Sequence, residues 1–297
     1  MRYSYYPGCS LKATGVAYDQ STRAVAGALG VELLELPDWN CCGATSYMSV
    51  RELLSMSISA RNLSLAERQG RDVVAPCSAC FTVLRKTDHY LHEMPELRKK
   101  VSSVLEAVDL GYRPGSVRVL HLLEAFRTVE AMRTFRDLVR SPLKGLRVAP
   151  YYGCQIVRPK VEFDHPELPT TLDDLLRAMG AEVVYYPVKT RCCGASLVAS
   201  NEAAAYRLCK NLLLCAQQNG AQCLVTLCPL CQMNLDGFQG EINAKYGTHF
   251  QVPVLYFTQL MGLAMGLPER SLGIGREIVD ATRLLSRYGS IAARPAV

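Results

Sequence analysis

The stretches Cys41-Cys42-Gly43 and Cys77-Ser78-Ala79-Cys80 occur a second time as Cys192-Cys193-Gly194 and Cys228-Pro229-Leu230-Cys231. The separation is the same for both motifs, since 192 − 41 and 228 − 77 both equal 151. Upstream, Tyr6-Pro7-Gly8-Cys9 is echoed by Tyr151-Tyr152-Gly153-Cys154. Five cysteines in the same order, four of them at one shared offset, indicate an internal duplication. We therefore predict two lobes, residues 1–142 and 143–267, and a C-terminal helical extension, residues 268–297.

Strand-like and helix-like patterns alternate along both halves. The first half predicts strands at residues 1–6, 31–36, 73–75 and 117–120, helices at 14–29 and about 43–69, and a last helix that runs through residue 140. The second half predicts strands at residues 146–151, 182–186, 222–226 and 252–256, and helices at 172–179 and about 194–218. This alternation is typical of parallel sheets covered by helices. The predicted fold is α/β: two duplicated lobes related by a pseudo-twofold axis, each a small, mostly parallel sheet flanked by helices.

Composition narrows the class of protein. The chain has 297 residues, of which 49% are apolar and 20% charged, as in soluble globular proteins. A net charge of +6 is too modest for a nucleic-acid binder. We expect no secretory signal and no membrane span, and a location in the cytoplasm or at a membrane through partner proteins. Thiols stay reduced in the cytosol, so the 13 cysteines point to metal binding or redox chemistry rather than to disulfides.

The repeated cysteines follow the ends of predicted strands. Cys9, Cys42 and Cys77 each come after a different strand of the first half, and the second half repeats the pattern. Ligand sites of parallel sheets lie outside the carboxyl ends of the strands, so three loops can bring their thiols together. The CCG glycines and the CxxC motifs also fall at predicted helix N-termini, where a thiolate is favoured.

Clustered thiolates suit zinc or an iron–sulfur cluster. One zinc ion or one cubane cluster needs only four of the five thiolates in each half, whereas adjacent cysteines can bind two different irons. A structural zinc in one lobe remains an alternative. A thioredoxin-like enzyme does not require the CCG motif beside its CxxC, and a zinc-ribbon nucleic-acid binder does not fit the charge.

The motifs as a set resemble the B-type catalytic subunit of heterodisulfide reductase, in the family with the cysteine-rich CCG domain. The resemblance spans the whole chain and rests on Tyr6-Pro7-Gly8-Cys9-Ser10-Leu11, Tyr152-Gly153-Cys154 with Arg158-Pro159, both CCG motifs and both CxxC motifs. It implies two non-cubane [4Fe–4S] clusters, one per lobe. The implied ligands are Cys9, Cys41, Cys42, Cys77 and Cys80 in the first lobe, and Cys154, Cys192, Cys193, Cys228 and Cys231 in the second.

The resemblance also implies a function. The chain would be the catalytic subunit that reduces a small disulfide to two thiols, with one electron from each cluster and with Cys42 and Cys193 at the reacting centres. No GxGxxG motif or P-loop is present, so the electrons must come from another protein. The implied partners are a ferredoxin-like [4Fe–4S] subunit and a flavin-containing subunit. The alternative function is electron transfer in a dehydrogenase or quinone-linked complex without disulfide chemistry.

Residues outside the ten cysteines give weaker signals. Anionic disulfides would need cations, and Lys12, Arg158, Lys189 and Arg191 flank the motifs, although cations are also ordinary surface residues. Cys209, Cys215 and Cys223 lie in apolar runs without counterparts in the first half, and we expect them to be structural. The five histidines show no ligand spacing, and the pair His89 and His92 is expected on a solvated helix face.

Overall fold

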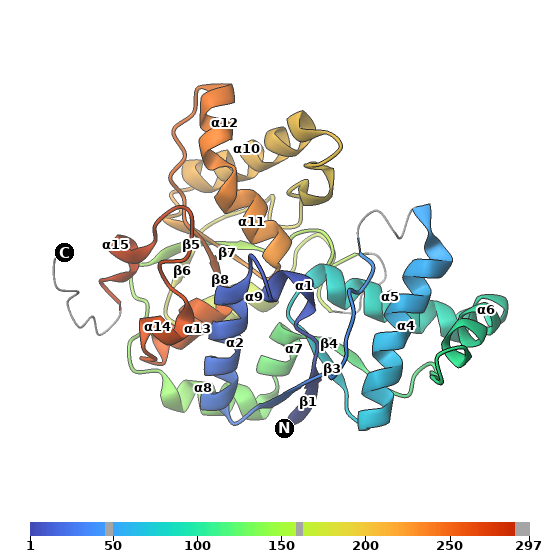
Figure 1. The fold of residues 1–297 in the computed structure, drawn as a ribbon. Coiled ribbons are helices and arrows are strands. Elements are labelled where there is room, and N and C mark those ends of the chain that lie inside the picture. Colours follow the sequence, from blue (N-terminus) through green and yellow to red (C-terminus); the bar gives the residue numbers. More distant parts are fainter. Residues whose placement is uncertain (45–49, 159–162, 289–297) are drawn as a thin grey trace.

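The computed structural model describes residues 1–44, 50–158 and 163–288 (Figure 1). The first half of the chain forms a four-stranded parallel sheet in the order β2-β1-β3-β4. Its strands are β1 (Arg2–Tyr5), β2 (Glu32–Glu35), β3 (Val73–Ala75) and β4 (Val119–His121). Its helices are α1 (Gly8–Leu11), α2 (Val16–Leu29), α4 (Glu52–Gln69), α5 (Ser78–Glu93), α6 (Pro95–Glu106), α7 (Leu122–Phe126) and α8 (Val129–Leu138).

The second half repeats this plan with a parallel sheet in the order β6-β5-β7-β8. The strands are β5 (Arg147–Tyr151), β6 (Glu182–Val183), β7 (Cys223–Thr226) and β8 (Val254–Tyr256). The helices are α9 (Thr171–Ala178), the 3₁₀ turn η1 (Ala195–Leu197), α10 (Glu202–Gln218), α11 (Pro229–Gly237), α12 (Gln239–Tyr246), α13 (Phe257–Ala264), α14 (Glu269–Leu272) and α15 (Thr282–Leu285). The predicted fold class, two duplicated α/β lobes with parallel sheets, is confirmed.

Several predicted bounds were wrong. The helix expected from about Gly194 is broken, because η1 ends at Leu197 and α10 begins only at Glu202. The Asn201 side chain caps α10 by accepting a hydrogen bond from the Ala204 nitrogen at 3.0 Å. The strand expected to reach Tyr186 ends at Val183, because only two of its residues pair with β5. The helix expected to run through Arg140 is two helices, α7 and α8, separated at Thr128, whose side chain caps α8.

Two further predictions concern segments that are only partly described. In place of the long helix from about Gly43, α4 begins at Glu52, and residues 45–49 lie outside the described residues. The C-terminal extension contains the short helices α14 and α15 joined by irregular chain, and residues 289–297 are likewise outside the description. Within the described ranges, no helix combines the length and apolar character needed to cross a membrane.

The two lobes share one packed interface, in which α2 of the first lobe lies against α13 and α14 (Figure 1). The Tyr18 ring stacks on Tyr256, with ring centroids 4.2 Å apart, and the Ser21 and Thr258 hydroxyls are 2.7 Å apart. One cluster of buried residues contains side chains of both lobes. The carboxyl ends of the two sheets are therefore held in a fixed relation. The lobe boundary near residue 142 stays a prediction.

Candidate functional site

The strand order places three cysteine loops side by side in each lobe. Cys9 lies in α1 just after β1, Cys42 follows β2, and Cys77 follows β3, and these strands are neighbours in the sheet. Cys154, Cys193 and Cys228 follow β5, β6 and β7 in the same arrangement. The predicted convergence at the carboxyl ends of the strands is confirmed, because the central strand of each set carries the first cysteine and its two neighbours carry the others.

Each CxxC motif begins a helix, as expected. Cys77 is the N-cap of α5 and Cys228 is the N-cap of α11, and both have extended backbone conformations. Of the two CCG glycines, Gly194 differs from the prediction, because it precedes only a short 3₁₀ turn. Residues 45–49, which follow Gly43, lie outside the described residues, so the expectation for Gly43 stays a prediction. Helix N-termini therefore support the CxxC thiols, whereas the second CCG motif ends in a tight turn at Gly194.

The turn at each CCG motif requires glycine. Gly43 and Gly194 have φ of 79° and 83°, a left-handed conformation that costs other residues about 1–2 kcal/mol. A Cβ atom on Gly194 would lie 2.9 Å from the Cα of Ala205, and one on Gly43 would lie 2.8 Å from the Ser55 Oγ. The chain must pass this close to α10 or α4 to turn two adjacent cysteines toward the other loops.

The thiols of both lobes form one chain of contacts. The Sγ–Sγ distance is 3.4 Å between Cys42 and Cys80 and 3.5 Å between Cys193 and Cys231. Across the lobe interface, Cys77 and Cys228 lie 3.9 Å apart. Hydrogen bonds between neighbouring thiols complete the series Cys41, Cys42, Cys80, Cys77, Cys228, Cys231, Cys193, Cys192 and Cys154. Cys9 lies near Cys41 at one end.

The thiol contacts favour one thiolate in each CCG motif. The hydrogen bond from Cys154 lowers the pKa of Cys192 to about 2, and the Gly194 N–H also donates to the Cys192 sulfur, at 3.2 Å. The hydrogen bond to Cys192 in turn raises the pKa of Cys193 to about 12. In the first lobe the bond with Cys41 lowers the pKa of Cys42 well below its ordinary value. Thiolates are the form that binds metals, so the site has the right protonation chemistry for a metal centre.

The glycine before each first cysteine leaves space beside the CxxC motif. Gly8 and Gly153 both have φ of 70°. A Cβ atom on Gly8 would lie 3.0 Å from the Cys80 sulfur, and one on Gly153 would lie 3.3 Å from the Cys231 sulfur. A side chain at either position would fill the space beside these sulfurs. The five-thiol donor set and this open space fit an iron–sulfur group in each lobe. As placed, no three Cys, His, Asp or Glu side chains among the described residues form a group that could hold a metal ion.

Two tyrosines were missed by the sequence reasoning. The Tyr6 hydroxyl donates to the Asn40 carbonyl, and the Tyr151 hydroxyl donates to the Arg191 carbonyl, both at 2.7 Å. Each acceptor residue directly precedes a CCG motif. The tyrosines are buried, and burial raises the pKa of both above its ordinary value. They tie the first cysteine loop of each lobe to the second. The signal in the sequence was a tyrosine three residues before Cys9 and three before Cys154.

A buried histidine was also missed. His121 is fully buried at the end of β4, and its Nε2 lies 3.3 Å from the carbonyl oxygen of Leu227, the residue before Cys228. The Tyr18 hydroxyl approaches the same oxygen, at 3.4 Å, and the Pro76 oxygen before Cys77, at 3.2 Å. These side chains fix the two CxxC motifs to each other through backbone carbonyls. His89, by contrast, pairs with Glu93 on α5 at 3.2 Å.

The predicted substrate cations lie in different surroundings. Lys12 pairs with Glu35 at 2.7 Å, Arg158 with Glu167 at 3.0 Å, and Lys189 with Asp173 at 2.9 Å. Arg191 is exposed and directly precedes the second CCG motif, and within the described ranges it forms no ion pair. Pro159, part of the resemblance, lies outside the described residues.

The three unmatched cysteines are not part of the chain of thiol contacts. Cys223 is buried in β7, and Cys215 is half-buried on α10. Cys209 is buried, and its thiol contacts the Cys193 carbonyl at 3.2 Å rather than a ligand sulfur. The Asn234 amide donates to the same carbonyl at 2.7 Å. Cys209 and Asn234 therefore support the backbone of the second CCG turn.

Comparisons with known proteins agree with this geometry. The model of the cysteine-rich domain CCG matches residues 3–85 and 148–236. The chain is 33% identical to the membrane anchor subunit of the 8-methylmenaquinol:fumarate reductase of Wolinella succinogenes, over 95% of this chain and 98% of that one. It is 29% identical to the B-type subunit of the ferredoxin/F(420)H(2)-dependent CoB-CoM heterodisulfide reductase of Methanosarcina acetivorans, over 98% of both chains.

A solved structure shares the fold. A hypothetical protein from Helicobacter pylori superposes with a TM-score of 0.75 at 16% identity, and the match covers 94% of this chain and 52% of that one. Two copies of the CCG domain, one in each half of the chain, contain all ten repeated cysteines. The chain therefore belongs to the family of cysteine-rich CCG-domain proteins that includes the B-type subunits of heterodisulfide reductases.

Proposed function

We propose that this chain is the catalytic iron–sulfur subunit of a heterodisulfide reductase-like complex. Each lobe would bind one non-cubane [4Fe–4S] cluster through its own five cysteines: Cys9, Cys41, Cys42, Cys77 and Cys80 in one, and Cys154, Cys192, Cys193, Cys228 and Cys231 in the other. Relatives named as heterodisulfide reductase subunits, alike over nearly their full length, support the class of reaction. The observation that carries the paired mechanism is the 3.9 Å contact between Cys77 and Cys228.

The reaction needs two electrons delivered at one place. A disulfide and two protons take up two electrons to give two thiols. When bound, each cluster supplies one electron, and the two lobes supply two. The electrons would come from a ferredoxin-like [4Fe–4S] partner protein, itself reduced by a flavin-containing subunit. Because Cys77 and Cys228 hold the two thiol groups in contact, a disulfide bound beside this contact would be reached from both lobes.

Exposure indicates the side from which a substrate would approach. Cys9, Cys41 and Cys192 are exposed, whereas Cys42, Cys77 and Cys228 are buried. The small disulfide would therefore approach from the side of the exposed first cysteine of each CCG motif. Cys42 and Cys193, which are buried, would hold the reacting centres from the interior of the protein. Arg191 has the best placement of the four candidate cations for an anionic substrate, since Lys12, Arg158 and Lys189 already pair with carboxylates.

A second candidate is electron transfer without disulfide chemistry. It is favoured by the 33% identity to a subunit of an 8-methylmenaquinol:fumarate reductase. In that function the same two clusters would pass electrons between partner proteins, in the cytoplasm or at a membrane surface through those partners. A structural zinc in one lobe is the alternative cofactor content.

Metal analysis of anaerobically purified protein tests the cofactors. Two clusters predict about eight irons and eight acid-labile sulfides with no zinc, whereas one cluster with a structural zinc predicts about four irons and one zinc. Cys42→Ser and Cys193→Ser should each remove one cluster while the protein still folds. Cys215→Ser is the matched control, because this half-buried thiol lies outside the chain of contacts and should keep all the iron.

Electron paramagnetic resonance separates the two functions. The reduced protein is mixed with candidate disulfides, and the signals of the clusters are followed. Oxidation of both clusters with release of two thiols supports the disulfide function. Unchanged signals with every disulfide, together with rapid exchange with a quinone-linked partner, would favour electron transfer instead. Full disulfide turnover by either single-cluster variant would refute the paired mechanism.

A further inference from the structure

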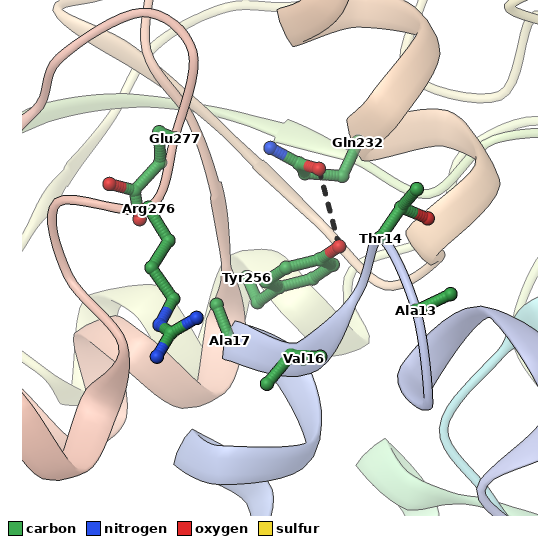
Figure 2. A pocket seen from close by; sticks show the side chains of 8 residues that line it. All are labelled: Ala13, Thr14, Val16, Ala17, Gln232, Tyr256, Arg276 and Glu277. Carbon is green, nitrogen blue, oxygen red and sulfur yellow. Dashed lines mark hydrogen bonds between the residues drawn. The ribbon is translucent and has the colours of Figure 1, made fainter.

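A pocket of about 160 Å³ lies between the two lobes and the C-terminal extension (Figure 2). Its walls come from the turn before α2, the first turn of α2, α11, the end of β8 and the loop after α14. The lining residues are Ala13, Thr14, Val16, Ala17, Gln232, Tyr256, Arg276 and Glu277. None of them is a cysteine, although Gln232 directly follows Cys231.

Close backbone approaches build the walls of this pocket. A Cβ atom on Gly15 would lie 3.1 Å from the Cβ of Pro229, at the start of α11. A Cβ atom on Gly273 would lie 2.8 Å from both the Cα and the Cβ of Ala17. Glycines thus allow the start of α2 to press against α11 on one side and the C-terminal extension on the other. The cavity that remains between these contacts is therefore shaped by the backbone packing and does not depend on the conformation of a single side chain.

Arg276 gives the pocket a cation that has no partner among the residues the structure describes. Its side chain reaches from the C-terminal loop toward the first turn of α2, alongside Tyr256 (Figure 2). Among the described residues, nothing forms a hydrogen bond or ion pair with its guanidinium. The neighbouring carboxylate of Glu277 is already engaged: one oxygen accepts from Gln259 at 2.7 Å and the other from the Gly275 nitrogen at 2.8 Å. Within the described ranges, the unpaired charge in the pocket is therefore positive.

The inner wall is polar and ordered. The Tyr256 hydroxyl donates to Gln232 Oε1 at 3.3 Å, and Gln232 Nε2 donates to the Val254 carbonyl at 3.2 Å. Tyr256 is held in place by its stacking on Tyr18. Its hydroxyl oxygen can still accept a hydrogen bond, while Val16 and Ala17 offer an apolar surface opposite. A ligand would thus meet a cation, a polar wall and a small apolar wall.

The equivalent positions of the first lobe carry different chemistry. Gln232 corresponds to Phe81, because both follow the last cysteine of a CxxC motif, and Tyr256 corresponds to His121 at the end of the fourth strand. The rings of Phe81 and His121 pack edge to face, 5.7 Å apart, and Phe163 lies against both. The pseudo-symmetry of the cysteines is therefore broken where the second lobe has the polar pocket.

We propose that this pocket binds the carboxylate of a small organic acid, with the acid group at Arg276 and its short carbon chain against Val16 and Ala17. A volume of about 160 Å³ is below the roughly 300 Å³ of the smallest sites for drug-sized ligands, so the ligand is small. The guanidinium suits a carboxylate because its planar N–H groups match two oxygens. The site does not depend on the proposed disulfide chemistry.

Calorimetry on the anaerobically purified holoprotein tests the site. Acetate, propionate and succinate are titrated, with propionamide as the uncharged control. We expect saturable binding of at least one acid, no binding of the amide, and about a tenfold or greater loss of affinity in Arg276→Gln, as expected for one lost charge-assisted hydrogen bond. Arg276→Lys should retain part of the affinity. Arg283→Gln, an exposed arginine of α15 outside the pocket, should bind like the original protein.

Other results would overturn the proposal. These are the absence of saturable binding by all three acids, equal binding of the amide, or unchanged affinity in Arg276→Gln. Thermal unfolding of the variants checks the fold: Arg276 is exposed and unpaired within the described ranges, so its replacement should leave the unfolding temperature unchanged. Tyr256→Phe gives a second measure, because it removes the hydroxyl from the wall but keeps the stacked ring, and it should weaken binding less than Arg276→Gln.

Discussion

The Sγ atoms of Cys77 and Cys228 lie 3.9 Å apart, although the two residues are 151 positions apart in the sequence. They occupy the same place in the two repeats, at the first position of each CxxC motif. Each is the N-cap of a helix that begins at the lobe interface. The pseudo-twofold relation of the lobes thus brings the two thiol groups into direct contact.

This contact predicts that the two metal centres influence each other. If both lobes are loaded, the electron paramagnetic resonance spectrum of the reduced protein should differ from the sum of the spectra of Cys42→Ser and Cys193→Ser, which each keep one centre. The reason is the contact of Cys77 with Cys228, which leaves no residue between the two groups. A wild-type spectrum equal to the sum of the two single-centre spectra would contradict the prediction.

The glycine of the second CCG motif should be essential to the site. Gly194→Ala should destabilise the protein by more than about 2 kcal/mol, because a strained positive φ is combined with a Cβ 2.9 Å from the Ala205 backbone, and it should lower the iron content. Gly30→Ala is the matched control: its φ is 68°, but no atom lies within 4 Å of the added Cβ. It should cost about 1–2 kcal/mol and keep the iron. Denaturant unfolding and iron analysis measure both effects, and equal losses in the two variants would count against the steric explanation.

The Tyr18 hydroxyl should stabilise the lobe interface. Tyr18→Phe removes the donor to the Pro76 and Leu227 carbonyls, and a buried group left without its partner costs about 1–3 kcal/mol. The stacking on Tyr256 would remain, so the change isolates the hydroxyl. Tyr185→Phe, at a side chain that is 75% exposed, should change the free energy of unfolding by less than about 0.5 kcal/mol. No difference between the two variants in urea unfolding would show that the hydroxyl is unimportant.

Asp236 should make stability depend on pH. Burial raises its pKa from 3.8 to about 6, against the effect of the Ile278 and Val254 nitrogens that donate to it. Between these values the folded protein holds a proton that the unfolded chain has lost. The stability contributed by this proton is complete below pH 3.8 and is lost as the pH rises through about 6. The total is roughly 3 kcal/mol, since one pKa unit corresponds to about 1.4 kcal/mol.

Asp236→Asn should remove this pH dependence. The free energy of unfolding of the variant relative to the original protein should rise between about pH 4 and about pH 6.5, because the variant has no carboxyl group to ionise there. Comparison at each pH cancels effects of acid on the rest of the molecule. Asp137→Asn on the exposed side of α8 is the control and should give a difference that does not change with pH. A flat difference for Asp236→Asn would show that the carboxyl ionises normally.

The three cysteines outside the repeat should be dispensable for metal binding. Cys223→Ala and Cys215→Ala remove thiols that lie away from the chain of contacts, and we expect the full iron content in both. Cys209→Ala removes a contact to the Cys193 carbonyl and should cost about 1 kcal/mol of stability without loss of iron. Loss of about half the iron in any of the three would mean that the ligand set differs from the two groups of five.

The sequence predicted more of the site than of the helix bounds. Cysteine motifs with a common offset identify the candidate ligands without any structure, and alternating strands and helices place them at the carboxyl ends of a parallel sheet. The break between η1 and α10 was not predicted, because the apolar pattern of the sequence continues through it. In the structure the Asn201 side chain caps a new helix at this point. The roles of Tyr6, Tyr151 and His121 were not predicted either, since each depends on a backbone carbonyl from a different loop.

The sequence alone determined the duplication, the parallel α/β class and the set of ten repeated cysteines, because these follow from spacing and periodicity along one chain. Only the tertiary structure decided that the lobes meet at Cys77 and Cys228, and that Arg276 of the C-terminal extension closes a pocket against α2. Contacts between residues more than a hundred positions apart depend on how whole layers of helices and strands pack together. Here the packing of α2 against α13 and α14 determines which residues of the two lobes meet.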